Sequence, residues 1–225
     1  SARRRRDQVN STIRGRKTLM RIITTSLAAT AMLAASAASA EVTGNLGFMS
    51  NYVFRGIEQN DSSAMGGLDW GNSGFYLGTW AADVDKGLEI DFYGGYGFDL
   101  GEFNLGIGGT YYWYTDNFDD DYKEVNLTAG WRWFTVNADI GQWDGFGDEQ
   151  DYQHYALTWE YEGFHLKAAT FEDDFDGTYY EVGYSTEIAG FDLSGAYIYS
   201  DDDLVGTEDN SNLMFTISKT FGLID

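Results

Sequence analysis

The chain has 225 residues, of which 43% are apolar, 17% aromatic and 22% charged, with 28 glycines, no proline, no cysteine and a formal net charge of −22. This is the length of one domain, and the missing cysteines exclude a disulfide scaffold, a zinc finger, a thiol nucleophile and an iron–sulfur cluster. Polyanionic nucleic acid is a poor partner for so acidic a chain. A mean hydropathy of −0.36 argues against helical membrane spans but leaves a membrane β-barrel open, because its strands show one apolar face.

The first forty residues differ from the rest, with eight of the fourteen bases, one acid and no aromatic residue. A basic start at Met20, an apolar stretch from Ile22 to Ala37 and the small residues Ala38-Ser39-Ala40 predict a secretory signal peptide. A transmembrane anchor is the alternative, but the stretch is short and rich in Ala, Ser and Thr. We therefore expect an upstream or non-native extension over 1–19, a signal peptide over 20–40 and one domain over 41–225.

The segment from Glu41 to Asp225 carries 35 acids, six bases and all 38 aromatic residues, a net charge of −29 over 185 residues. A soluble protein would need a large core to bury so many aromatic side chains. A barrel in lipid instead shows them outward, in belts where the bilayer meets water.

Apolar residues alternate with polar ones along this segment. Leu88, Ile90 and Phe92 are apolar, whereas Glu89 and Asp91 lie between them, which is the period of two expected of a strand. Most of these runs are close to the about nine to eleven residues that cross a bilayer when tilted. The alternation predicts twelve strands, at 42–55, 63–70, 75–84, 88–98, 103–114, 122–131, 134–143, 152–161, 164–171, 178–188, 191–199 and 212–221. Tyr76, Leu77, Trp80 and Ala81 give the strand at 75–84 no clear apolar face.

The connections alternate between two kinds. Tight turns are expected at 71–74, 99–102, 131–134, 162–163 and 189–190, with aromatic residues beside most of them. Longer, mostly acidic loops are expected at 57–62, 83–87, 116–121, 144–151, 172–177 and 200–211. Outer-membrane barrels have short periplasmic turns and long outer loops, and twelve strands return the chain to the periplasm without an unpaired edge.

Alternation alone does not say whether the apolar face points inward or outward, so a soluble secreted sandwich or a lipocalin-like barrel is the alternative fold. The signal peptide, the even number of strands, the two kinds of connection and the absence of proline favour a membrane barrel. The predicted fold is all-β, a transmembrane antiparallel up-and-down β-barrel of about twelve strands.

The octapeptide Ser50-Asn51-Tyr52-Val53-Phe54-Arg55-Gly56-Ile57 resembles the signature of the TorF-like porin family of proteobacterial outer-membrane proteins. The resemblance continues through Gly66-Gly67-Leu68-Asp69, Ser73 to Gly78, Leu88 to Asp91 with Gly94 to Tyr96, and Ile217 to Phe221. It implies a porin-like barrel in the outer membrane of Gram-negative bacteria. Phe221 also resembles the terminal aromatic that the barrel-assembly machinery recognises, although Gly222 to Asp225 follow it here.

Catalytic motifs are scarce. His154 and His165 are predicted to lie on neighbouring strands and to face the lumen, where hydrogen bonds with Thr158, Glu160 and Lys167 are the simplest interpretation. No combination of Ser, His and an acid suggests a lipolytic barrel, and no glycine-rich phosphate loop is present. We therefore expect no enzyme activity and no cofactor.

Three functions remain: a diffusion porin, a non-conducting structural or surface-interaction barrel, and, least favoured, a barrel enzyme. Twelve strands can leave a narrow passage, and Tyr76, Trp80, Tyr93 and Tyr112 are candidates to plug it. The expected partners of a porin are outer-membrane lipid, the assembly machinery and small solutes. The predicted pore-lining residues are Asp69, Glu89, Asp91, Glu124, Asp139, Glu160 and Glu181, with the bases Arg55 and Lys167. Their acidic balance predicts a preference for cationic or neutral solutes.

The acidic loops are dense enough in carboxylates to suggest divalent cations as further partners. Their spacing matches no EF-hand, and a solvated acidic surface is the simpler interpretation, so no metal site is predicted. The weak candidates for cation binding are Asp119, Asp120, Asp121, Asp173, Asp174, Asp201, Asp202 and Asp203.

Overall fold

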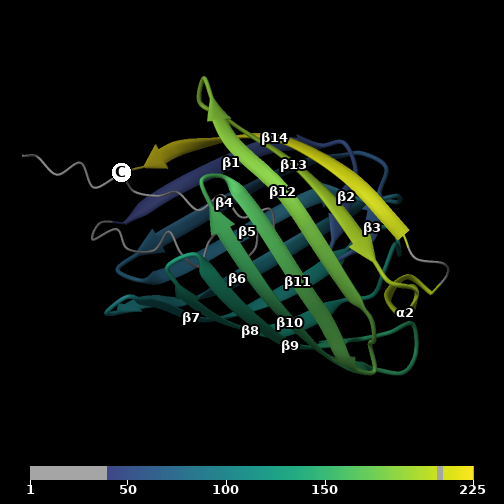
Figure 1. Cartoon of the computed structure of the whole chain (residues 1–225). Coiled ribbons are helices and arrows are strands. Elements are labelled where there is room, and N and C mark those ends of the chain that lie inside the picture. Colours follow the sequence, from purple (N-terminus) through teal and green to yellow (C-terminus); the bar gives the residue numbers. More distant parts are fainter. Residues whose placement is uncertain (1–39, 207–209, 225) are drawn as a thin grey trace, which may run out of the picture.

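The computed structural model describes residues 40–206 and 210–224. Within these ranges the chain forms a closed antiparallel barrel of twelve strands, each paired with its neighbour in the chain, and β14 pairs with β1 to close the wall (Figure 1). The barrel strands are β1 (Glu41–Met49), β4 (Ser63–Asn72), β5 (Phe75–Asp83), β6 (Leu88–Leu100), β7 (Phe103–Tyr114), β8 (Tyr122–Trp131), β9 (Phe134–Trp143), β10 (Gln150–Tyr161), β11 (Phe164–Asp173), β12 (Thr178–Ile188), β13 (Phe191–Ser200) and β14 (Asn210–Ile224). The predicted fold and strand number are confirmed. The predicted extension and all but the last residue of the predicted signal peptide lie outside the described residues.

The apolar face of the wall points outward. Phe92 on β6 is 49% exposed, whereas its neighbours Asp91 and Tyr93 are 2% and 6% exposed. The same alternation holds on β8, where Leu127 is exposed and Asn126 and Thr128 are buried. Because successive side chains of a strand point to opposite faces, the wall is apolar outside and largely polar and aromatic inside.

The two rims of the barrel differ. One rim, here the turn rim, carries tight two-residue connections, and three of these are Ser73-Gly74, Glu162-Gly163 and Ala189-Gly190. Both residues of each pair have positive φ, the geometry of a type I′ turn, whose twist matches that of the strands it joins. Exposed aromatic side chains gather beside this rim and include Trp70, Phe75, Phe98, Phe103, Trp131, Trp133, Phe134, Tyr161 and Phe164.

The opposite rim, here the loop rim, carries the longer connections. One of them contains the short helix α2 (Asp202–Val205), whose first turn is capped by the Asp201 carboxylate and which ends at Gly206 in the left-handed region. In Figure 1 α2 lies at the end of the barrel opposite the one where β14 ends. No helix in the described part of the chain is long and apolar enough to span a membrane.

The first predicted strand, 42–55, is wrong beyond Met49. The chain leaves the wall there and forms a separate hairpin of β2 (Tyr52–Phe54) and β3 (Ile57–Asn60), where a loop was expected. Arg55 and Gly56 join the two strands with φ values of 48° and 85°, again a type I′ geometry. The apolar run Tyr52-Val53-Phe54 has strand propensity, but the sequence pattern does not distinguish a strand in the wall from one beside it.

Candidate functional site

The β2–β3 hairpin lies against the inner surface of the barrel near the loop rim. Tyr52 and Val53 are 4% and 8% exposed and belong to a buried cluster of inward-facing side chains from most of the wall. The Ser200 hydroxyl donates a 2.7 Å hydrogen bond to the carbonyl oxygen of Gly56 at the hairpin turn. The hairpin is therefore a plug, fixed to the wall at its tip.

The Arg55 guanidinium at the tip of the plug pairs with two wall carboxylates. Its Nη1 and Nη2 lie 2.8 Å and 2.9 Å from the two carboxylate oxygens of Glu124, a bidentate arrangement, and Nη2 lies 2.9 Å from Asp139. The side chains of Arg55, Glu124 and Asp139 are 13%, 0% and 9% exposed. Asn126 donates to both carboxylates, at 2.7 Å and 2.9 Å, and so helps to hold them together. Charge-assisted bidentate pairs with little solvent access are among the stronger polar contacts in proteins.

Two tyrosine hydroxyl groups complete the hydrogen bonding of the Glu124 carboxylate. Tyr112 and Tyr152 donate hydrogen bonds of 2.7 Å and 2.8 Å to its two oxygens. Together with Arg55 and Asn126 they surround a carboxylate that has no solvent exposure of its own. The plug therefore docks on a carboxylate that side chains of the wall hold in place.

Both histidines point inward and are hydrogen-bonded, as the sequence suggested, but with partners other than those expected. His154 lies 2.9 Å from Asp139 through Nδ1 and 3.1 Å from the Tyr179 hydroxyl through Nε2. His165 lies 2.7 Å from Glu181, which also pairs with Lys167 at 3.4 Å. Both rings thus serve in lumenal hydrogen-bond networks.

Two further carboxylates lie on β6. Glu89 is completely buried and accepts a 2.7 Å hydrogen bond from the Tyr52 hydroxyl of the plug. Asp91, two residues on, faces the same side of the strand and is 2% exposed. On β4, Asp69 accepts hydrogen bonds from Tyr93 at 2.5 Å and from Asn45 at 3.5 Å.

The structure places all nine predicted pore-lining residues inside the barrel, and their role in lining a pore stays a prediction. It brings Arg55, Glu124 and Asp139 together, and separately Lys167 with Glu181. Arg55 reaches the lumen from the plug and not from the wall, which the sequence reasoning missed. The signal that could have found it is the Arg55-Gly56 pair, which interrupts the alternation with a turn.

One small cavity adjoins the tip of the plug. A cavity of about 80 Å³ lies between its tip and the wall, lined by Arg55, Thr110, Asn126, Asn137, Lys167 and further inward-facing residues. Four wall residues were predicted to fill the passage, and all four are buried inside the barrel, where they narrow the lumen further: Tyr76, Trp80, Tyr93 and Tyr112.

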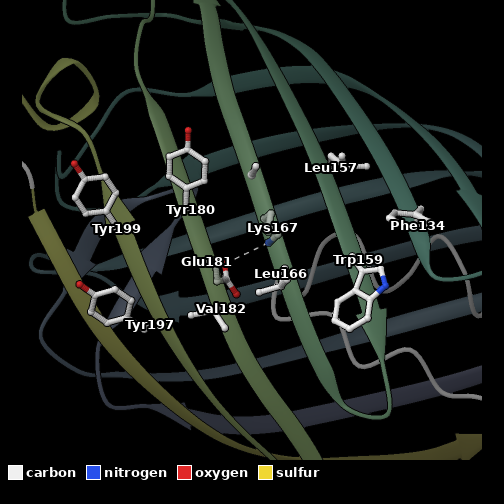
Figure 2. A pocket seen from close by; sticks show the side chains of 11 residues that line it. Phe134, Leu157, Trp159, Leu166, Lys167, Tyr180, Glu181, Val182, Tyr197 and Tyr199 are labelled. Carbon is white, nitrogen blue, oxygen red and sulfur yellow. Dashed lines mark hydrogen bonds and ion pairs between the residues drawn. The ribbon is translucent and has the colours of Figure 1, made fainter.

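A larger groove of about 450 Å³ lies on the outer wall over β9 to β13 (Figure 2). Tyr180, Tyr197 and Tyr199 stand on one side of it and Trp159 and Phe134 on the other, with Leu157, Leu166 and Val182 between them. The Lys167–Glu181 ion pair belongs to the strands that form its floor. The groove is part of the apolar exterior and is separate from the lumenal site.

The acidic loops are organised by their own hydrogen bonds. Asp119 accepts from the Tyr122 hydroxyl at 2.8 Å and from Trp143 Nε1 at 3.0 Å, and its burial raises the pKa of this carboxyl despite those bonds. The neighbouring carboxylates of Asp202 and Asp176 raise the pKa of Asp203. Within the described ranges no three His, Asp or Glu side chains are arranged to hold a metal ion.

Comparison with known proteins places the chain in a family. Residues 33–221 match the sequence pattern of a bacterial protein family of unknown function, Gcw_chp. The chain belongs to the Gcw_chp family. No curated protein matches it. The Gcw_chp match covers the whole barrel up to Phe221 and includes the octapeptide that builds the plug.

A porin is among the solved structures that are similar to this Gcw_chp protein. The NanC porin in a rhombohedral crystal form aligns with a TM-score of 0.53 and 10% identity, covering 81% of this chain and 100% of that chain. A structure described under the in-meso crystallisation of membrane proteins aligns with a TM-score of 0.55 and 10% identity, covering 80% of this chain and 84% of that chain. At this identity the likeness concerns the fold alone.

Proposed function

We propose that this Gcw_chp protein is an outer-membrane, porin-like channel for the passive diffusion of small solutes, with a preference for cationic or neutral ones. The observation that carries the proposal is the closed barrel with an apolar outside and an inside lined by carboxylates and other polar groups. Such a wall satisfies every strand hydrogen bond within lipid and offers a polar route through it. We propose no catalytic role and no cofactor.

The exterior supports the location. Aromatic side chains beside the turn rim match the belt that membrane barrels place at the water interface, and the apolar band lies between that belt and the acidic loops. On this basis the turn rim faces the periplasm and the loop rim the outside of the cell. Outer-membrane lipid and the barrel-assembly machinery are the partners this location requires, and the TorF-like resemblance stays a prediction.

The plug controls passage in this proposal. A cavity of about 80 Å³ holds a few water molecules and does not admit a solute, so conduction requires the plug to shift. The Arg55 ion pairs with Glu124 and Asp139 hold it closed. A lid that is held by charge at its tip can open without unfolding the barrel.

The charge balance supports a preference for cations. Seven inward carboxylates lie in the barrel against Arg55 and Lys167, and both bases are already paired with carboxylates. An excess of negative charge in a narrow passage lowers the energy of a cation and raises that of an anion.

A second function is favoured by the filling of the lumen. The plug and the buried aromatic residues leave little space, as expected of a non-conducting structural or surface-interaction barrel whose acidic loops contact cations. In that case the plug would be a permanent part of the core.

Liposome swelling separates the two functions. Vesicles containing the purified chain are diluted into isotonic solutions of a neutral sugar, an organic cation or an organic anion, with empty vesicles as the control. A channel predicts swelling that is faster with sugar and cation than with anion. Swelling no faster than in empty vesicles, both for the natural chain and for a plug-weakened Arg55→Asn variant, would reject the channel.

A further inference from the structure

Four buried side chains on the inner faces of β5 and β6 carry polar atoms without a hydrogen-bond partner among the described residues. They are Tyr76 through its hydroxyl, Trp80 through Nε1, Glu89 through Oε2 and Asp91 through Oδ1. Each of these residues is less than a tenth exposed. Buried polar atoms are nearly always hydrogen-bonded, so each of these atoms calls for a partner.

The strand register brings aromatic rings around the two carboxylates. Trp80 on β5 and Tyr112 on β7 are the direct cross-strand neighbours of Asp91, one on each side, and Tyr114 is the neighbour of Glu89. Directly opposed residues on one face of a sheet have β-carbons about 5 Å apart, so these side chains are in contact range.

The plug covers the pair from the other side. The Tyr52 ring meets Trp80 edge-on with ring centres 5.8 Å apart, and the Tyr52 hydroxyl donates to Glu89 Oε1. Trp80 therefore packs between the plug and the strand that carries the free oxygens of Glu89 and Asp91.

Carboxylate oxygens accept hydrogen bonds and do not donate them, so these two oxygens call for a donor, and a positively charged one best offsets their burial. The inner bases do not provide it, because Arg55 is paired with Glu124 and Asp139 and Lys167 with Glu181. A cation from outside the chain would.

We propose that Glu89 and Asp91, enclosed by Trp80, Tyr112 and Tyr52, form a binding site for a small primary alkylammonium ion. Its N–H groups donate to the two carboxylates, while its charge and alkyl group lie against the ring faces. A quaternary ammonium has no N–H to donate. A hard divalent cation such as Ca²⁺ takes about six to eight oxygen ligands, which is more than two carboxylates provide. The proposal deepens the cation preference proposed above and rests on it for the route to the site.

Titration calorimetry on the full chain in detergent micelles tests this site without any measurement of transport. Ethylammonium chloride is injected at constant ionic strength, and we expect saturable heat for one site. Asp91→Asn and Glu89→Gln should each weaken binding at least about tenfold. Glu187→Gln, which removes an exposed carboxylate on β12, should leave binding unchanged.

The preference of the site for a primary ammonium over other cations is tested on the natural chain, so the result does not depend on whether a variant folds. Tetramethylammonium and Ca²⁺ should each bind at least about tenfold more weakly than ethylammonium. Absence of saturable heat with ethylammonium, equal binding of tetramethylammonium, or tighter binding of Ca²⁺ would each overturn the assignment. Saturable ethylammonium binding in a protein that fails to swell liposomes would reject the channel and keep the site.

Discussion

Arg55 and Glu124 lie 69 residues apart in the chain, yet two nitrogen–oxygen contacts of 2.8 Å and 2.9 Å join them inside the barrel. One residue belongs to the plug and the other to the wall. Because the Glu124 side chain has no exposed surface, the pair depends on the wall to position the carboxylate and on the plug to supply the charge that balances it. The contact therefore holds the plug against the inner wall of the barrel.

Replacing Arg55 by Asn should release the plug. Asn-Gly is a favoured type I′ turn sequence, so the variant keeps the backbone geometry of the hairpin and removes the guanidinium. Breaking a buried ion pair by removing one partner costs about 3–5 kcal/mol, because the other charge stays buried without compensation. Chymotrypsin should cleave after Tyr52 or Phe54 much faster in the variant than in the natural chain.

Arg132→Asn is the matched control for that change. Arg132 also has positive φ, but its 3.4 Å pair with Glu102 is solvent-exposed at the turn rim. Exposed pairs contribute about 0–1 kcal/mol, so this variant should be as resistant as the natural chain. Equal resistance of both variants would mean that the ion pair does not hold the plug.

The orientation of the barrel can be read from single cysteines. A cysteine replacing Asp120 or Asp202 at the loop rim should react with a membrane-impermeant thiol reagent on intact cells, because that rim is proposed to face outward. A cysteine replacing Asn72 beside the turn rim should react after the outer membrane is broken. The reverse pattern would mean that the orientation is wrong.

The acidic loops are expected to stay solvated. Asp119 and Asp201 already accept hydrogen bonds from neighbouring groups, and the described loops hold no metal-like cluster. Calorimetric titration with Ca²⁺ should therefore give no saturable heat at micromolar to millimolar concentrations. Saturable heat that disappears in an Asp201→Asn/Asp202→Asn/Asp203→Asn variant would favour the surface-interaction function.

Ion selectivity should depend on the β6 carboxylates. The reversal potential across a planar bilayer under a KCl gradient should indicate a preference for cations, and Glu89→Gln combined with Asp91→Asn should reduce that preference. The effect should fade at high salt, because the Debye length falls from about 8 Å at physiological ionic strength to about 3 Å at 1 M. An anion-selective sign, or a preference unchanged in the double variant, would contradict the role of these carboxylates.

The sequence predicts the wall well because alternation carries a direct physical signal. Glu89 and Asp91 alternate along the strand with apolar residues such as Ile90. An apolar outer face therefore places both carboxylates inside the barrel, where the structure has them. The tight turns were also predicted, because pairs such as Ser73-Gly74 place a glycine, which tolerates positive φ, between two alternating runs.

The local sequence pattern does not predict which face of the strand at 75–84 points inward. Its inward face carries Tyr76 and Trp80, whose size resembles that of outward residues such as Leu77. Gly78 makes room for this packing, because a β-carbon there would clash with the Tyr93 ring of the next strand. That contact depends on the pairing of two strands, and the docking of Arg55 on Glu124 likewise depends on distant residues, so neither follows from a local sequence pattern.

Single-channel recording tests the central claim that the barrel is a channel closed by its plug. The natural chain, Arg55→Asn and Arg132→Asn are each reconstituted in planar bilayers at the same salt concentration. We expect low or intermittent conductance for the natural chain and Arg132→Asn, and larger, sustained conductance for Arg55→Asn. Identical conductance of all three, or no conductance from any of them, would contradict the claim.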